Sequence, residues 1–130
     1  GFGSADYCAS TGGDMGKASL AYGRGKIINA AALYNTLALD GVWLNFRDPD
    51  GFREETLYVK TMGFKGRFAI HPDQIKPIHD AYRPTPEELE WAKGVLEEAK
   101  TAGSGAFKYQ GKMVDAPVLA VARLIISRED

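Results

Sequence analysis

The sequence predicts an α/β protein built around parallel strands, and two observations lead to this prediction. Between about residues 24 and 82, helical segments alternate with short apolar runs in the order helix, strand, helix, strand, helix. This alternation of helices and strands is typical of a parallel sheet or barrel. At Arg83-Pro84-Thr85-Pro86 the pattern changes, and two helices with one short strand follow. We therefore expect two parts, residues 1–83 and residues 84–130.

The first part is predicted as follows. Residues 1–16 are expected to be a loop, and residues 24–36 an amphipathic helix. Residues 39–46 are rich in Val, Trp, Leu and Phe, which suits a buried parallel strand. The next helix is expected to have Asp50 as its N-cap and to end at Gly63, since glycine is favoured just past a helix.

The segment that follows is the most informative in the chain. A short apolar strand over residues 67–70 stops at His71-Pro72, and a helix over residues 73–82 begins directly after it. In α/β proteins, ligands bind where strand ends lead into a loop and a helix N-terminus. This segment is therefore a candidate for the wall of a binding site.

The second part begins with a strong helix signal. Thr85 is a good N-cap, Pro86 suits the first helical position, and two glutamates fill the first turn. We expect a helix from there to about Ala102. A strand over 107–110, a tight turn at 111–112 and a last helix over 117–127 complete the prediction.

Composition excludes several classes of partner. The formal net charge is −1, which argues against nucleic-acid binding by bulk electrostatics. No run approaches the roughly 20 apolar residues of a membrane-spanning helix. Cys8 is the single cysteine, which excludes an internal disulfide and fits a cytoplasmic protein in a reducing environment.

Two motifs carry a family resemblance. The first is Gly63-Phe64-Lys65-Gly66-Arg67-Phe68-Ala69-Ile70-His71-Pro72-Asp73-Gln74, and the second is Gly111-Lys112-Met113-Val114-Asp115-Ala116-Pro117. These two motifs, and the order of the shorter motifs along the chain from Gly3-Ser4-Ala5-Asp6 onward, closely resemble those of the citrate lyase β-subunit and malyl-CoA lyase family. The resemblance implies the C-terminal part of a TIM (β/α)8 barrel in residues 1–83, followed by a small, α-rich, lid-like unit in residues 84–130. The missing N-terminal barrel portion is then an expected partner.

The same resemblance implies a function. Members of this family are carbon–carbon lyases that perform a retro-Claisen cleavage of a 3-hydroxy-acyl thioester, with Mg²⁺ or Mn²⁺ as cofactor. The implied substrate is an acyl-CoA or acyl-carrier thioester such as malyl-CoA, citramalyl-CoA or a citryl thioester. A cytoplasmic homo-oligomer is expected, in which a neighbouring subunit completes each active site.

Site residues carry over position by position. Asp6 matches a metal ligand whose partner glutamate would lie upstream of Gly1, although a turn-capping aspartate is the simpler alternative. Arg24 matches an arginine that contacts CoA phosphates, but a solvated arginine at a helix start is almost as good an explanation. Ile70, His71 and Pro72 match the wall along which the CoA or carrier arm lies.

Asp115 is the expected catalytic residue. In the family it acts from a lid-like unit on a neighbouring subunit's site, where a carboxylate near a thioester methyl can serve as general acid and base. Its position just before a helix also makes it a natural N-cap, and the two roles are compatible.

Two alternatives to a thioester lyase stay open. A thioester-independent metal aldolase of the same superfamily would share the barrel but would not be expected to carry the motif of residues 111–117. The other alternative is an incomplete, non-catalytic chain that needs an N-terminal half, because two or three strands cannot close a barrel and leave exposed edges.

Overall fold

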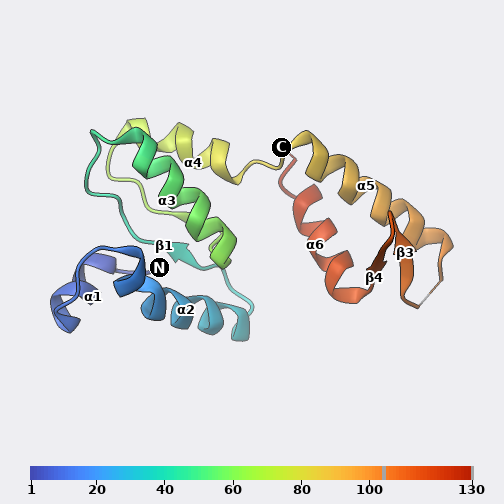
Figure 1. Ribbon diagram of the computed structural model, residues 1–130, viewed down its shortest axis with the longest axis horizontal. Coiled ribbons are helices and arrows are strands. Elements are labelled where there is room, and N and C mark those ends of the chain that lie inside the picture. The colour runs from blue at the N-terminus through green and yellow to red at the C-terminus, as the bar shows by residue number, and fades with distance from the viewer. Residues whose placement is uncertain (104, 130) are drawn as a thin grey trace. The chain divides into compact units, whose positions relative to one another are not determined.

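The computed structural model describes residues 1–103 and 105–129 (Figure 1). Ser104 and Asp130, within the predicted 84–130 unit, lie outside the described residues. The chain divides into two compact units, one from Gly1 to Tyr82 and one from Arg83 onward. Each unit has its own apolar core.

The first unit contains a short parallel sheet. Strand β1 (Leu39–Asp40) pairs with β2 (Gly66–Arg67), with Leu39 opposite Gly66 and Asp40 opposite Arg67. On the other side of β1, the Phe2 amide donates to the Leu39 carbonyl at 2.9 Å. The N-terminal residues therefore run beside β1, and three segments reach the same edge of the sheet.

Both strands are shorter than the expected ranges 39–46 and 67–70. Beyond Asp40 the chain leaves the sheet, and Leu44 and Phe46 are 57% and 54% exposed. The Trp43 indole donates to the Asn45 carbonyl within this segment, 2.8 Å away. The apolar run thus marked a surface loop, because apolar composition does not by itself supply a partner for ladder hydrogen bonds.

Five helices surround these strands: α1 (Ser4–Thr11), α2 (Lys17–Leu33), α3 (Pro49–Met62), a 3₁₀ turn η1 (Pro72–Gln74) and α4 (Ile75–Tyr82). Helix α1 corrects the expected loop over 1–16; it ends at Gly12, which has φ +74°. Helix α2 begins at Lys17, earlier than the expected residue 24, because glycines within it do not break it.

The N-cap of α3 is Asp48, so the expectation of Asp50 was wrong. An Asp48 carboxylate oxygen accepts from the Gly51 amide at 2.9 Å, whereas Asp50 lies in the first turn. Pro49 explains the shift, since proline favours the first helical position and the cap is the residue before it. The core of the unit is formed by Phe2, Cys8, Leu20, Ala31, Ala38, Val59 and Phe64.

Gly63 ends α3 as expected, with φ +118°. We predict that Gly63→Ala lowers the free energy of unfolding by about 1–3 kcal/mol, because an L-residue is strained at this backbone conformation. Gly25→Ala is the matched control: a Cβ there meets no atom within 4 Å, and Gly25 lies within α2. That change should stabilise by about 0.5–1 kcal/mol. Denaturant unfolding measures both, and equal effects would contradict the assignment.

The second unit is a helix, a hairpin and a helix. It comprises α5 (Pro86–Thr101), β3 (Phe107–Tyr109), β4 (Lys112–Val114) and α6 (Ala116–Ile126). The predicted start of α5 is confirmed by a full capping box: Thr85 Oγ1 accepts from the Glu88 amide, and the Thr85 amide donates to Glu88 Oε2.

For the hairpin of this unit, the sequence predicted the first strand and a turn but not the second strand. β3 and β4 are antiparallel, with Phe107 opposite Val114 and Tyr109 opposite Lys112. The turn lies at Gln110-Gly111, one residue earlier than expected, and both residues have positive φ (49° and 78°). That conformation is typical of a two-residue hairpin turn, which places Lys112 in a strand. The unit's core is Ala92, Val95, Val114 and Ala122.

No helix among residues 1–103 and 105–129 is long and apolar enough to cross a membrane.

Candidate functional site

Three chain segments converge at the carboxyl edge of the β1–β2 sheet. Residues 1–6, Gly41-Val42 after β1 and Phe68 after β2 line a pocket of about 410 Å³. Asp6 lies on this pocket, in the first turn of α1, and its side chain is exposed. The sheet edge therefore presents one carboxylate in a hollow, as expected of a ligand site in an α/β protein.

Directly behind this edge lies a buried ionic network centred on Asp40, a residue with no exposed surface. Arg24 binds Asp40 through two nitrogens, Nε at 3.0 Å and Nη2 at 3.1 Å. The Arg24 Nη2 atom also donates to Glu55 Oε1 at 2.6 Å. Arg67 Nη2 lies 3.4 Å from Asp40 Oδ2, the oxygen that also accepts from Arg24 Nη2. The network joins α2, β1, α3 and β2.

Arg67 has further partners. Its Nη1 donates to Thr56 Oγ1 at 3.1 Å, its Nη2 donates to the Gly41 carbonyl at 3.2 Å, and its guanidinium carbon lies 5.0 Å from the Phe52 ring centre. Burial lowers the pKa of Arg67, against the opposing charges of Asp40 and Glu55.

For Arg24, burial also acts to lower the pKa. The hydrogen bonds and charges of Asp40 and then Glu55 outweigh that effect, and the pKa is raised. Two cations and two anions share this buried region. A charge removed from it would leave the opposite charge unpaired away from water.

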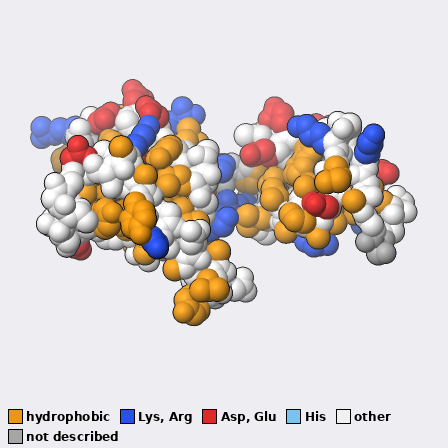
Figure 2. Space-filling model, turned by 60° about the horizontal axis from the view of Figure 1, so that its bottom comes forward, with side chains coloured by type: hydrophobic (Ala, Val, Ile, Leu, Met, Phe, Trp, Pro, Cys, Tyr) orange, Lys and Arg blue, Asp and Glu red, His pale blue; other side chains and the backbone are white. Residues whose placement is uncertain are grey.

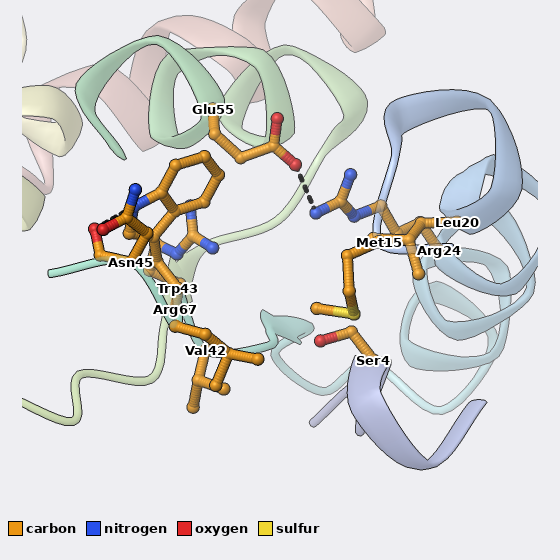
Figure 3. A pocket seen from close by; sticks show the side chains of 10 residues that line it. Ser4, Met15, Leu20, Arg24, Val42, Trp43, Asn45, Glu55 and Arg67 are labelled. Atoms are coloured by element: carbon orange, nitrogen blue, oxygen red, sulfur yellow. Dashed lines mark hydrogen bonds and ion pairs between the residues drawn. The ribbon is translucent and has the colours of Figure 1, made fainter. Parts of the chain in front are cut away.

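A second pocket, of about 220 Å³, opens beside the network (Figure 3). Figure 3 shows Glu55 joined to Arg24 above the pocket, Ser4 and Val42 below, and Trp43 and Arg67 on the side opposite Arg24. Ser4 and Val42 also line the pocket of Asp6, so the two hollows adjoin. The lining residues are Ser4, Met15, Leu20, Arg24, Val42, Trp43, Leu44, Asn45, Glu55 and Arg67.

The structure places Arg24 differently from the sequence prediction. It lies within α2 rather than at a helix start, it is 2% exposed, and its Nε and Nη2 atoms are bound by carboxylates. Its expected contact with CoA phosphates stays a prediction.

The expected CoA wall at Ile70, His71 and Pro72 is on the surface of the first unit. Ile70 is 53% exposed, and its amide donates to the Gln74 side chain at 2.9 Å. The His71 ring stacks on Phe46, with ring centres 5.3 Å apart, and its Nδ1 accepts from the Asp73 amide at 3.2 Å. An apolar and aromatic surface thus follows β2, and its role in CoA binding stays a prediction.

Asp115 lies in the second unit as the N-cap of α6. It is half-buried, and its Oδ1 accepts from the Val118 amide at 3.4 Å. The long hydrogen bond is a weak one. Asp115 and Arg123 line a pocket of about 320 Å³ within this unit. The carboxylate is therefore held in place by a cap and lies next to a hollow.

Sequence reasoning did not identify Asp40, Glu55 or Arg67 as members of a buried network. One signal was available in α3: Phe52, Glu55, Thr56 and Val59 recur at helical spacing and are all buried. A glutamate on the apolar stripe of a helix requires a buried partner, since charged side chains are almost never buried unpaired.

The residues of the first unit do not by themselves form a metal centre. Within the described part of the chain, no group of three or more His, Cys, Asp or Glu side chains could hold an ion. Asp6 supplies a single carboxylate, and Mg²⁺ usually requires one or two carboxylates with further oxygen ligands.

Comparisons with known proteins agree on one family. A family model described as C–C bond lyase of the TIM-barrel fold matches residues 24–129. Citramalyl-CoA lyase, mitochondrial, from Rattus norvegicus is 37% identical over 97% of this chain, and citrate lyase subunit beta-like protein from Deinococcus radiodurans is 36% identical over 98%. The chain spans 39% and 47% of these two relatives.

A solved structure is also similar. CitE from Mycobacterium tuberculosis, in complex with magnesium, acetoacetate and coenzyme A, superposes with a TM-score of 0.80 at 36% identity. The match covers 98% of this chain and 50% of that chain.

Proposed function

Because the chain belongs to the family of C–C bond lyases of the TIM-barrel fold, we propose that it carries the C-terminal part of a lyase that cleaves a 3-hydroxy-acyl thioester. The reaction is a retro-Claisen cleavage, and citramalyl-CoA, malyl-CoA or a citryl thioester is the class of substrate. Support comes from relatives named citramalyl-CoA lyase and from the coenzyme A bound to CitE. These names favour a thioester lyase over the thioester-independent aldolase and over a non-catalytic chain.

The observation that carries the proposal is the hollow at the carboxyl edge of the sheet. It holds Asp6, it adjoins the buried network, and the exposed surface of Ile70, His71 and Pro72 follows the neighbouring strand. A thioester arm has an apolar chain with amide groups, which suits that surface. We assign Ile70, His71 and Pro72 to the CoA or carrier arm, and Arg24 to the network that holds the strand ends.

We propose that Asp115 transfers the proton at the thioester end. The 3-hydroxyl proton passes to solvent as the C3 carbonyl forms, the bond between C2 and C3 breaks to release an oxo-acid, and the electron pair of that bond remains as a thioester enolate on C2. Protonation of that carbon by Asp115 gives the acetyl thioester. In the reverse direction the Asp115 carboxylate removes a proton from the acetyl methyl. Because Asp115 lies in the second unit, a neighbouring subunit can present it to the site.

The proposal includes a divalent cation, Mg²⁺ or Mn²⁺, with Asp6 as one ligand. Magnesium in the CitE complex supports this cofactor. The described residues supply one carboxylate at the pocket, and we propose that a second ligand comes from another part of the assembly. Bound there, the cation would supply a Lewis acid for the developing alkoxide.

We further propose that residues 1–83 are the C-terminal part of a TIM (β/α)8 barrel and residues 84–130 a lid-like unit. The parallel β1–β2 pair and the coverage of the relatives support the first assignment. Large apolar side chains on the surface of the first unit, including Leu44 and Phe46, would be covered by an N-terminal barrel portion. Figure 2 shows hydrophobic side chains gathered on the surface in both parts of the chain. Homo-oligomerisation and a cytoplasmic location are proposals as well; the buried free thiol of Cys8 fits a reducing compartment.

A lyase assay tests the proposed function. We expect the complete assembly to release acetyl-CoA from malyl-CoA or citramalyl-CoA, and a chelator to abolish turnover until Mg²⁺ is restored. The 130-residue chain without an N-terminal portion should show no turnover, since it lacks the second metal ligand. Cleavage that persists in excess chelator, or turnover by the isolated chain, would contradict the proposed site.

A further inference from the structure

The side chain of Gln74 joins the two loops that follow the parallel strands of the first unit. Its Nε2 donates to the Trp43 carbonyl, after β1, at 2.9 Å, and its Oε1 accepts from the Ile70 amide, after β2, also at 2.9 Å. Gln74 is 3% exposed, so this bridge lies beneath the surface. A primary amide both donates and accepts, as a peptide group does. The side chain therefore stands in for a peptide group between the two loops.

The bridge begins where the sheet ends. Among the described residues, the last backbone hydrogen bond between the two segments runs from the Phe68 amide to the Asp40 carbonyl, at 3.1 Å. Beyond it the chain forms the loops of residues 41–48 and 68–71, where buried backbone groups still need partners. Gln74 supplies one partner to each loop. It therefore extends the connection between the two segments past the end of the ladder.

The turn η1 places Gln74 at this position. Pro72 begins the turn and His71 caps it: His71 Nδ1 accepts from the Asp73 amide at 3.2 Å, and the His71 carbonyl accepts from the Gln74 amide at 3.0 Å. Proline also fixes its own φ, which leaves the backbone of the turn little freedom. The turn thus holds the glutamine side chain beneath the loops that it joins.

The same two loops meet a second time, at the surface. The Phe46 ring, from the loop after β1, stacks on the His71 ring, from the loop after β2, with ring centres 5.3 Å apart and planes at 11°. Phe46 is 54% exposed and Ile70 is 53% exposed. Side chains that keep so much contact with water gain little from burial. Their arrangement therefore depends on how the two loops are held.

We propose that Gln74 is a positioning residue for the surface of Ile70 and His71. Its two hydrogen bonds set the loop after β1 against the loop after β2, which keeps His71 stacked on Phe46 before a ligand binds. A surface that is already ordered binds more tightly, because less side-chain freedom is lost on binding. The identity of the ligand, the CoA or carrier arm of a thioester, rests on the proposed function; the connection between the loops does not.

Proton NMR of the full 130-residue chain tests the connection between the loops. Gln74→Met keeps a flexible side chain of similar length and removes the strong donor and acceptor. At a pH of about 8, where histidine side chains are neutral, the ring signals of His71 should move toward their positions in a Phe46→Leu variant, which lacks the stack. The other histidine, His79, is exposed and serves as the internal reference. Gln74→Glu, which keeps the acceptor and loses the donor, should shift the His71 signals in the same direction.

Val59→Ala is the control for a general loss of stability. Val59 belongs to the core of the same unit and is 0% exposed, so its truncation lowers the denaturation midpoint by leaving a cavity. The His71 signals should nevertheless keep their parent positions.

The parent protein provides a test that needs no variant to fold. The chain has two glutamines, Gln74 and the exposed Gln110. The side-chain amide protons of Gln74 should exchange with water at least about tenfold more slowly than those of Gln110, because they are buried and one of them is hydrogen-bonded.

Binding of coenzyme A to the complete assembly tests the positioning role. Gln74→Met should raise the Kd for coenzyme A about 2- to 12-fold, the cost of ordering one side chain again at a binding surface. The kcat for an acyl-CoA substrate should stay within about twofold of the parent, because the change affects binding of the arm and not the reacting atoms. Val59→Ala should alter neither quantity.

Two results would overturn the connection between the loops: rapid exchange of the Gln74 side-chain amide, or His71 signals that keep their parent positions in Gln74→Met. A lost stack with an unchanged Kd for coenzyme A would overturn the positioning role. A parent assembly that binds no coenzyme A contradicts the proposed function, and the assignment of the arm falls with it. The NMR measurements involve neither coenzyme A nor turnover, so they still decide whether Gln74 orders this surface.

Discussion

Replacing Asp115 by asparagine is expected to lower kcat of the complete assembly by about 10²–10⁴, the usual effect of removing a positioned acid–base group. The amide keeps the size of the side chain and an acceptor oxygen, so the hydrogen bond from the Val118 amide can persist. Asparagine also caps a helix about as well as aspartate. We therefore expect the free energy of unfolding and the affinity for the thioester to stay close to those of the parent.

Asp48 provides the matched control for this change. It is also an aspartate N-cap, and it accepts from the Gly51 amide as Asp115 accepts from the Val118 amide. Asp48→Asn should leave kcat unchanged. Steady-state kinetics of the two variants separate the roles: a silent Asp115→Asn would mean that Asp115 is an N-cap and nothing more.

The second large effect is expected at the buried network. Asp40→Ala should lower the free energy of unfolding of the first unit by about 3–5 kcal/mol, because it leaves Arg24 and Arg67 without their shared carboxylate. The side chain of Asp40 has no exposed surface, so water cannot replace it. Denaturant unfolding followed by Trp43 fluorescence, in a Trp91→Phe background, measures the change.

An exposed ion pair of the same unit is the control. Lys17 Nζ lies 2.6 Å from Glu54 Oε1, but the two side chains are 44% and 74% exposed. Glu54→Ala should cost no more than about 1 kcal/mol, as is usual for surface pairs. If Asp40→Ala cost equally little, the network would not hold the strand ends together, and its place behind the Asp6 pocket would have no structural consequence.

Local signals in the sequence predicted the parts of the fold that local chemistry decides. Thr85 with Glu88 forms the expected capping box, and Gly63 ends α3 in the left-handed conformation that glycine favours. The α/β class also followed from the alternation of helices and strands. These features depend on residues a few positions apart, which is why a single sequence is sufficient to predict them.

Features that depend on distant contacts were not predicted. The strand at residues 39–46 was predicted to be too long. A strand extends only as far as a neighbouring segment forms backbone hydrogen bonds with it, whatever the length of the apolar run. The network of Arg24, Asp40, Glu55 and Arg67 joins residues up to 43 positions apart in sequence, and no local pattern relates them. The helical spacing of apolar residues in α3 is sufficient to predict that Glu55 is buried. It does not predict which residues Glu55 pairs with. Asp6 and Asp115 rest on the family resemblance, and their roles stay predictions.

Subunit mixing tests the central claim, that Asp115 acts on the site of a neighbouring subunit. Assemblies with Asp115→Asn and assemblies with Asp6→Asn should each be inactive. When the two kinds of subunit mix at random in equal amounts, about a quarter of shared sites carry both native carboxylates, and activity should recover in proportion. Mixed oligomers that are shown to form and yet remain inactive would contradict the account.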